Sequence, residues 1–138
     1  MKDFAKILVP VDGSKKSFEA LDRALTLAGF THGEVTCIHV IPDIPEGGPR
    51  TKDMQKHLKE DGNIVLKKAA RRAGKNTKFK TRLVHGAPHT EIIKIARNGK
   101  FDHIVMSTTG KGAADADMLG SVSNYVLHKS KVPVYLIK

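Results

Sequence analysis

The chain is organised around a short apolar run with a glycine-bearing loop and a later helix start, Ile104-Val105-Met106-Ser107-Thr108-Thr109-Gly110-Lys111-Gly112 and then Gly120-Ser121-Val122-Ser123-Asn124. The apolar run predicts a short buried strand, and Gly120-Ser121 predicts the start of a helix. Because Gly110 and Gly120 have no Cβ, the loop backbone can bring its N–H groups close to phosphate oxygens. A helix start adds unpaired N–H donors and the positive end of a dipole. The segment therefore predicts a cradle for nucleotide phosphates.

The composition is that of a water-soluble globular protein. With 138 residues, of which 40% are hydrophobic, we expect a single domain over residues 1–138. No apolar run reaches the roughly 18–20 residues that a membrane span needs, and only a brief one precedes Asp12, so we expect no signal peptide. Cys37 is the one cysteine, which favours a reducing cytoplasm. The net charge of +10 favours anionic partners: nucleotides, nucleic acid or acidic membrane surfaces.

Strand and helix patterns alternate along the whole chain. We expect strands over 6–11, 34–41, 78–84, 103–106 and 132–137, and helices from Ser14 to Gly29 and over 51–73, 90–97 and 121–128. Met54, Leu58, Val65 and Ala69 are expected on the buried face of the second helix. Pro133 predicts that the last strand lies at a sheet edge, since proline removes a ladder donor. This order predicts an α/β fold, a doubly wound five-stranded parallel sheet with helices on both faces.

Ligands of such sheets bind beyond the carboxyl ends of the strands, where the strand order reverses. There we expect Asp12 to accept hydrogen bonds from a ribose, a slot for a flat base between Pro10, Val40 and Met106, and phosphates against Gly110, Gly120, Ser121 and Val122. Taken alone, Asp12-Gly13-Ser14 is more simply a turn followed by a helix cap, and Gly120-Ser121 an ordinary helix start. The joint placement of these pieces at strand ends favours a binding site.

Several motifs, in order, resemble the universal stress protein family, and specifically its ATP-binding branch. They are Ile7-Leu8-Val9-Pro10-Val11-Asp12-Gly13-Ser14, His39-Val40, Phe101-Asp102-His103-Ile104-Val105-Met106 and Val132-Pro133-Val134-Tyr135-Leu136. The family signature is Gly, two residues, Gly, nine residues and Gly-Ser. Gly110 and Gly120-Ser121 match it, whereas Ser107 stands at the first glycine. There a side chain either crowds the ligand or donates its hydroxyl to a phosphate.

The resemblance implies a Rossmann-like, adenine nucleotide alpha hydrolase-like fold that binds ATP, with or without Mg²⁺, between the first and fourth strands. The expected nucleotide-binding residues are Pro10, Val11, Asp12, Gly13, Ser14, Val40, Met106, Ser107, Gly110, Lys111, Gly120, Ser121 and Val122. The resemblance also implies a homodimer that pairs through residues 132–137, and an apolar edge strand is itself unsuited to water.

Other motifs are weaker. Lys111 is equally suited to a phosphate contact and to a solvated loop, and Asp115 and Asp117 are more simply loop residues than Mg²⁺ ligands. The spacing of Gly110-Lys111-Gly112 fits neither a P-loop nor a dinucleotide fingerprint. Pro88 between His85 and His89 argues against a shared metal-binding helix face. Residues 67–82 carry eight basic side chains and no acid, which is typical of a solvated face and less often of a nucleic-acid site.

Three functions remain open from the sequence. The first is a nucleotide-dependent stress or signalling protein with at most slow hydrolysis, since no residue set resembles a positioned nucleophile and base. The second is a dimeric interaction protein of the same family that binds no nucleotide. The third, which is less favoured, is a nucleic-acid-binding module that uses the basic segment of residues 67–82.

Overall fold

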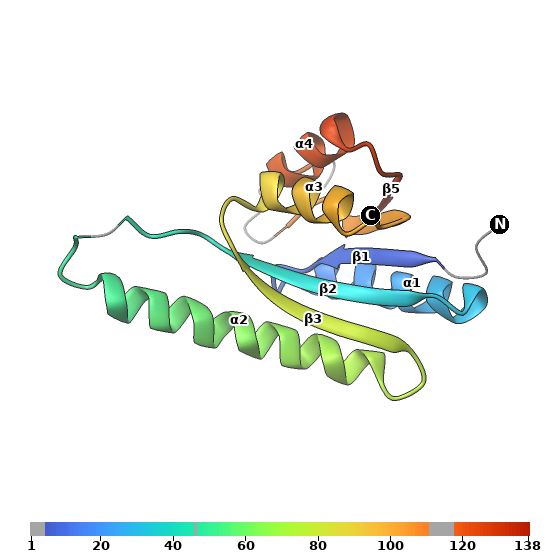
Figure 1. Cartoon of the computed structure of the whole chain (residues 1–138), viewed down its shortest axis with the longest axis horizontal. Coiled ribbons are helices and arrows are strands. Elements are labelled where there is room, and N and C mark those ends of the chain that lie inside the picture. The colour runs from blue at the N-terminus through green and yellow to red at the C-terminus, as the bar shows by residue number, and fades with distance from the viewer. Residues whose placement is uncertain (1–4, 46, 111–117) are drawn as a thin grey trace.

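The computed structural model describes residues 5–45, 47–110 and 118–138. In chain order the elements are β1 (Lys6–Pro10), α1 (Lys15–Thr31), β2 (Glu34–Ile41), α2 (Thr51–Ala73), β3 (Lys78–His85), α3 (Pro88–Asn98), β4 (His103–Ser107), α4 (Ser121–Lys129) and β5 (Val134–Ile137). Within the described residues the strands form a parallel sheet in the order β3-β2-β1-β4-β5 (Figure 1). This arrangement confirms the predicted doubly wound α/β fold.

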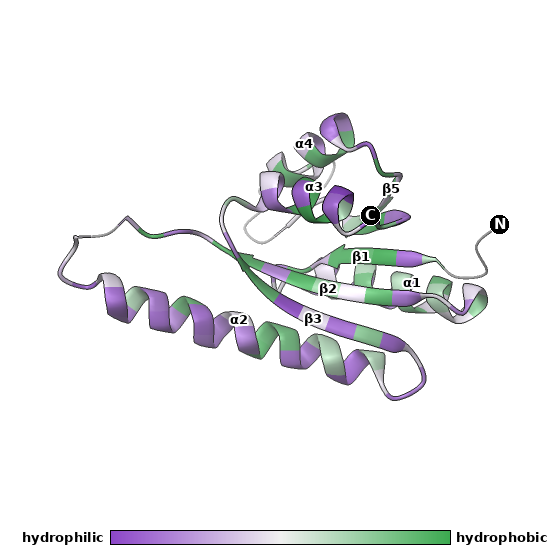
Figure 2. Ribbon diagram, in the orientation of Figure 1, coloured by the Kyte–Doolittle hydropathy of each residue, from purple (hydrophilic) through white to green (hydrophobic). Residues whose placement is uncertain are grey.

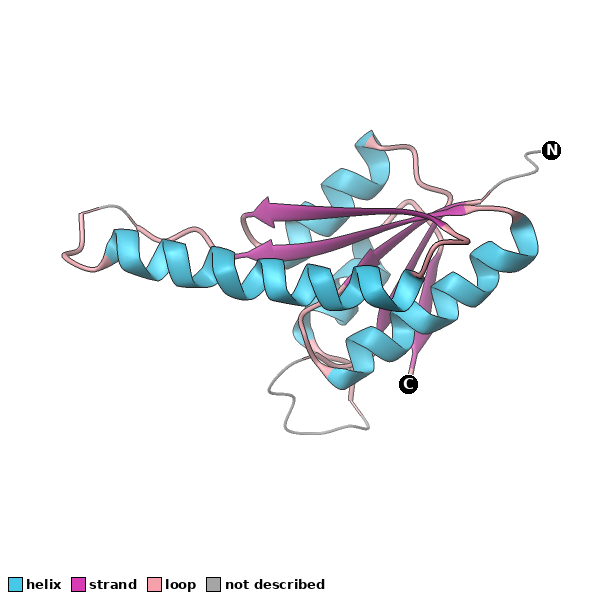
Figure 3. Ribbon diagram, turned by 90° about the horizontal axis from the view of Figure 1, so that it is seen from below, coloured by secondary structure: helices cyan, strands magenta, loops and turns pink. Residues whose placement is uncertain are grey.

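Helices cover the sheet on both faces, and each face has its own core. Helices α1 and α2 pack on the face that includes Ile7 and Val9, and both lie in front of the strands in Figure 3. Helices α3 and α4 pack on the opposite face, which includes Leu8 and Ile104. Successive residues of β1 therefore point into different cores, which is why this central strand is a continuous apolar run. Figure 2 shows β1 as mostly hydrophobic, whereas the edge strand β3 alternates with hydrophilic residues.

Three predicted boundaries are wrong by two residues: α3 begins at Pro88 instead of residue 90, and the end of α1 and the start of β5 also differ. Helix α1 continues through Gly29 and ends at Thr31, where His32 takes a left-handed conformation (φ 53°) and its N–H donates to the Ala28 carbonyl. An αL residue of this kind ends the helical hydrogen-bond pattern more effectively than a glycine that keeps helical angles. Strand β5 begins at Val134 instead of residue 132, because Ser130 Oγ bonds both the N–H and the carbonyl of Val132 and holds a turn there.

The buried face of α2 is predicted correctly only in its second half, where Ala69 is buried and Val65 packs against the core. The buried residues are Gly62, Leu66 and Ala69, whereas Met54 is exposed. The first half of α2 extends past the ends of the strands, so the sheet does not lie beneath this part of the helix (Figure 3). Gly62 lets the helix approach the sheet closely, because a Cβ there would lie 2.6 Å from Leu83 Cδ1.

Candidate functional site

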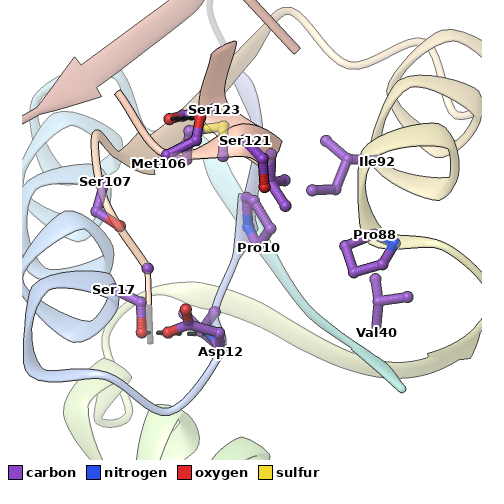
Figure 4. Close-up of a pocket in the computed structure, with 14 residues that line it drawn as sticks. Pro10, Asp12, Ser17, Val40, Pro88, Ile92, Met106, Ser107, Ser121 and Ser123 are labelled. Carbon is purple, nitrogen blue, oxygen red and sulfur yellow. Dashed lines mark hydrogen bonds between the residues drawn. The ribbon is translucent and has the colours of Figure 1, made fainter. Parts of the chain in front are cut away.

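A cavity of about 450 Å³ opens beyond the carboxyl ends of β1 and β4, where the strand order reverses (Figure 4). Its lining residues are Pro10, Val11, Asp12, Ser17, Val40, Pro88, Ile92, Met106, Ser107, Gly110, Gly120, Ser121, Val122 and Ser123. They come from β1, the turn after it, α1, β2, α3, β4 and α4. The volume is in the range of small-molecule sites, and the position is the one at which doubly wound sheets bind ligands. We call this cavity the switch-point pocket.

One side of the switch-point pocket is apolar. Val40 at the end of β2 faces Pro88 and Ile92, which lie one turn apart at the start of α3 (Figure 4). Pro10 and Met106 continue this surface at the ends of the two central strands. Pro88 occupies the first turn of α3, where a missing N–H costs no helical hydrogen bond. The result is an aliphatic slot that suits a flat, weakly polar group.

The turn after β1 holds Asp12 in a fixed orientation. Asp12 Oδ1 accepts from the Ser14 N–H at 2.9 Å, and the Asp12 N–H donates to Ser17 Oγ at 3.4 Å. Ser14 Oγ in turn accepts from the Ser17 N–H at 3.1 Å and caps α1. Gly13 permits the turn, with φ at +90°. The turn-and-cap interpretation of this motif is therefore confirmed, and the same turn places Asp12 on the pocket wall.

The loop after β4 is tied to α4 by its own carbonyls. The Gly120 N–H donates to the Thr108 carbonyl at 2.8 Å, and Ser123 Oγ donates to the same oxygen at 2.6 Å. Ser107 Oγ donates to the Thr109 carbonyl at 2.7 Å, so this hydroxyl turns back onto the loop. Ser107 is buried. Short hydrogen bonds thus close the loop, and the Thr108 N–H donates to the Ile137 carbonyl of β5 at 2.9 Å.

Gly110 and Gly120 lie close to each other and to Asp12. A Cβ placed on Gly120 would lie 3.7 Å from the Gly110 nitrogen, and a Cβ placed on Gly110 would lie 2.5 Å from Asp12 Oδ2. The second distance is shorter than real Cβ contacts, so only glycine at 110 leaves the carboxylate in this position. The loop after the fourth strand and the turn after the first therefore meet in one place.

The start of α4 supplies further backbone donors. Gly120 is its N-cap and has no side chain with which to cap the helix, and the first intrahelical bond runs from the Asn124 N–H to the Gly120 carbonyl at 2.9 Å. The N–H groups of Ser121, Val122 and Ser123 precede that bond, and all three residues line the pocket. Such N–H groups, with the helix dipole behind them, favour an anionic group.

Ten of the residues predicted from the sequence line the switch-point pocket together. They are Pro10, Val11, Asp12, Val40, Met106, Ser107, Gly110, Gly120, Ser121 and Val122. Gly13 and Ser14 do not line it, because they form the turn and the helix cap. Lys111, Asp115 and Asp117 lie outside the described residues.

The sequence analysis missed four lining residues, Ser17, Pro88, Ile92 and Ser123. Ser17 and Ser123 each lie three residues after a predicted helix cap, on the turn that faces back toward the cap. Pro88 and Ile92 are four residues apart, on one face of their helix. Helical spacing could have indicated these faces, but only the placement of α3 shows that its face meets the pocket.

Other candidate sites do not form within the described residues. No cluster of three potential metal ligands occurs there. The His89 ring packs edge-on against Tyr125, with 4.6 Å between centroids, and so joins α3 to α4. Burial raises the pKa of the Cys37 thiol to about 12, which keeps it protonated in the core. None of the described helices combines the length and the hydrophobicity of a membrane span.

The basic segment of residues 67–82 does not form a single surface. Arg72 Nη1 pairs with Asp22 Oδ2 at 2.6 Å, and its guanidinium lies 5.0 Å from the Phe18 ring centroid, so this arginine joins α2 to α1. On β3, Phe79 and Leu83 pack against the α1/α2 core. Lys80 and Arg82 alternate with them and belong to the opposite face. The segment is therefore divided between the two sides of the sheet.

The sequence and the structure were compared with those of known proteins, and the matches belong to one family. A sequence profile of the universal stress protein family matches residues 3–138. Universal stress protein MJ0531 of Methanocaldococcus jannaschii is 35% identical over 98% of this chain and 82% of its own length. The structure of universal stress protein UspA from Lactobacillus plantarum matches with a TM-score of 0.83 and 26% identity over 97% of both chains. A crystal structure of a universal stress protein in complex with cAMP matches with a TM-score of 0.78 and 25% identity over 99% of both chains. The chain belongs to the universal stress protein family.

Proposed function

We propose that this protein binds ATP, or another adenine nucleotide, in the switch-point pocket and acts as a nucleotide-dependent stress or signalling protein. The observation that carries the proposal is the meeting of Gly110, Gly120 and the start of α4 beside Asp12 in one cavity. The structural relative that was crystallised with cAMP supports an adenine nucleotide as the ligand class. The proposal places this chain in the ATP-binding branch of its family.

Each part of the pocket fits one part of a nucleotide. The aliphatic slot of Pro10, Val40, Met106, Pro88 and Ile92 suits an adenine ring. Asp12, beside Val11, is a hydrogen-bond acceptor for ribose hydroxyls. For the phosphates, the donors are the main-chain N–H groups next to Gly110 and at the start of α4. Lys111 is a further candidate phosphate contact.

The residues that line the pocket favour nucleotide binding without fast ATP hydrolysis. Among the described residues of the pocket, Asp12 is the one carboxylate, and no histidine, lysine or cysteine is present. The carboxylate already accepts the Ser14 N–H and lies beside Gly110 at the loop. Efficient hydrolysis requires a positioned base or water-orienting group together with charge stabilisation at the transferred phosphate. We therefore propose that ATP hydrolysis is slow at most. Any Mg²⁺ in the pocket would bind together with the triphosphate.

We further propose that the protein is a cytoplasmic homodimer built from a single domain over residues 1–138. Strand β5 pairs with β4 on one side and is the last strand of the sheet. It is half-buried except for Tyr135, which is 49% exposed. A second copy that pairs along this edge would satisfy its free backbone groups and cover Tyr135. Light scattering at micromolar concentration tests this, and a monomer contradicts it.

Thermal denaturation with and without ATP tests nucleotide binding. We expect millimolar ATP to raise the melting temperature of the wild-type protein, because a ligand that binds only the folded state stabilises it. Asp12→Ala should abolish the rise, and Asp43→Ala, which removes a carboxylate from an exposed loop, should preserve it. Mass spectrometry of small molecules released from freshly purified protein gives an independent readout. The absence of both a thermal shift and a co-purified nucleotide contradicts the proposal.

A second function is favoured by Ser107, which stands at the first glycine of the family signature. In this alternative the fold serves as a dimeric interaction protein that binds no nucleotide. It predicts a stable dimer whose partner binding is unaffected by Asp12→Ala and by added ATP.

A further inference from the structure

A second cavity, of about 490 Å³, lies on the α3/α4 face of the sheet, away from the switch-point pocket. Its floor comes from the first part of three strands: Lys6 of β1, Thr36 of β2, and Lys80, Thr81 and Arg82 of β3. Its wall comes from α3 and the turn after it, with Glu91, Lys94, Ile95, Asn98, Gly99 and Phe101. We call this cavity the basic groove. It shares no lining residue with the switch-point pocket.

The groove exists because α3 and α4 do not reach the edge strand. In Figure 1 no helix is drawn in front of β2 and β3, whereas α1 passes behind β1 and β2. Thr36 and Lys80 are paired in register, which sets Lys80 beside the part of β2 that α3 leaves open. Because Phe79 and Leu83 point to the α2 side, Lys80 and Arg82 point to this one.

Four cationic side chains from three different elements converge on the groove, against one carboxylate, Glu91. Lys80, Arg82 and Lys94 are exposed. Within the described part of the chain, none of these three forms an ion pair with a carboxylate. Glu91 is the one carboxylate in the lining, so the groove carries a net positive charge.

The fourth cation is held in place. Lys6 Nζ donates to the Gly99 carbonyl at 2.6 Å and lies 4.6 Å from the Phe101 ring centroid. An ammonium group has three donors, so these contacts fix its position without exhausting its capacity. Thr36 and Asn98 add neutral side-chain donors along the same cavity.

Protection of a sheet edge does not account for the whole arrangement. Basic residues on an edge strand discourage pairing with other chains, and this reason covers Lys80 and Arg82 on β3. It does not cover Lys94 on α3 or Lys6 on the central strand β1, which face the same cavity. The convergence of cations from separate elements is what an anion site requires.

We propose that the basic groove binds a compact anion that carries two or more phosphate groups. The guanidinium fork of Arg82 matches phosphate oxygens in a bidentate manner, and the three lysines supply point charges around it. The size of the cavity suits a small molecule. A nucleic-acid strand would instead need cations along a line and aromatic rings for its bases. The one aromatic residue in the lining, Phe101, is buried beneath Lys6.

Titration calorimetry with inorganic tripolyphosphate tests this proposal. The titration is done without nucleotide, and Gly110→Ala reports any contribution of the switch-point pocket. We expect the double variant Lys80→Gln with Arg82→Gln to weaken tripolyphosphate binding by at least about tenfold, because it removes two charge-assisted contacts. The matched control is Lys67→Gln with Lys68→Gln, which removes the same charge from the exposed side of α2 and should change binding by less than about threefold.

Several outcomes would overturn the proposal. An equal loss in both double variants would mean that tripolyphosphate senses only net charge. Loss of binding in Gly110→Ala would place the anion in the switch-point pocket. Tighter binding of a single-stranded oligonucleotide than of tripolyphosphate, weakened by both double variants, would assign the surface to nucleic acid. Lys94→Gln, which acts from α3, repeats the test should the β3 variant fail to fold, and an unchanged affinity there contradicts the shared site.

A separate arm of the same experiment asks whether the phosphates belong to an organic molecule or to an inorganic polyphosphate. A hexose bisphosphate carries its phosphates on an organic frame, and inorganic tripolyphosphate carries them without one. Binding of either that depends on Arg82 supports the phosphate site, and binding of citrate alone, a multivalent carboxylate, would contradict it.

Discussion

The two cavities of this protein suit anions in opposite ways. The switch-point pocket has no lysine or arginine among its described lining residues and offers glycine backbone and the start of a helix. The basic groove has four cationic side chains and no helix start. Main-chain donors are fixed in direction and close to the ligand, whereas side-chain charges act over a distance and are screened by salt. The comparison teaches that the net charge of the chain does not locate the proposed nucleotide site.

Helix α3 forms a wall of both cavities. Pro88 and Ile92, four residues apart, face the switch-point pocket, and Glu91, Lys94 and Ile95 face the basic groove. This division follows from the 3.6-residue helical period, which sends neighbouring residues to different sides. The apolar face of α3 meets the aliphatic slot of the switch-point pocket, and its more polar face meets the groove.

The largest expected effect that separates the two cavities is that of Gly110→Ala. The new Cβ would lie 2.5 Å from Asp12 Oδ2, so the carboxylate must move. We expect ATP binding to weaken by more than about tenfold, because the ribose acceptor and the loop both shift. Tripolyphosphate binding to the nucleotide-free wild type and to the nucleotide-free variant should differ little. Calorimetry measures both.

The matched control for this variant is Gly29→Ala. A Cβ at Gly29 meets nothing within 4 Å, and the residue lies inside α1. Alanine there should stabilise the protein by about 0.5–1 kcal/mol and leave ATP binding unchanged. An ATP-dependent thermal shift that survives Gly110→Ala would remove Gly110 from the nucleotide site.

The next effect concerns the loop of the switch-point pocket alone. Ser107→Ala removes the hydroxyl that donates to the Thr109 carbonyl, and we expect a cost of about 1 kcal/mol in the free energy of unfolding. Denaturant titration measures this cost. Ser107→Gly restores the family signature but also lacks the hydroxyl. Weaker ATP binding by Ser107→Gly means that the hydroxyl orders the loop, and tighter binding means that the wild-type side chain crowds the ligand.

A smaller expected effect is a difference between the two cavities in the salt dependence of ligand binding. Raising the ionic strength from about 0.05 M to about 0.2 M should weaken tripolyphosphate binding by about threefold, since the cations of the basic groove are exposed and screened. The same change should affect ATP binding less, because the donors of the switch-point pocket are main-chain groups in a partly enclosed cavity. Equal salt dependence for both ligands contradicts the distinction.

The smallest effect concerns the part of the basic segment that belongs to neither cavity. Arg72→Ala removes the pair with Asp22 and the contact with the Phe18 ring. Both partners of the pair are about half exposed, so we expect a loss of only about 0.5 kcal/mol in unfolding free energy. Lys68→Ala, on the exposed side of α2, should cost less. Any change in tripolyphosphate affinity in Arg72→Ala would join this residue to the basic groove.

The sequence by itself determined the order of elements and one of the two cavities. An uninterrupted apolar run such as Ile7-Leu8-Val9 is typical of a strand that is covered on both faces, and β5 lies at the predicted edge, directly after Pro133. Glycines at 110 and 120 indicated a close approach of backbone, which is a local property that the sequence carries. These features depend on residue type and short-range spacing, so they could be predicted without coordinates.

Only the tertiary structure decided which distant faces meet. The Ser107 hydroxyl turns onto the Thr109 carbonyl, and Pro88 and Ile92 complete the aliphatic slot, because the crossovers set α3 and the β4 loop at particular positions on the sheet. Residues 67–82 looked continuous in sequence, yet the sheet passes between Arg72, which pairs with Asp22, and Arg82, which lines the basic groove. Charge has no periodicity that fixes its direction in space, and the burial of apolar neighbours such as Phe79 and Leu83 decides where each cation points.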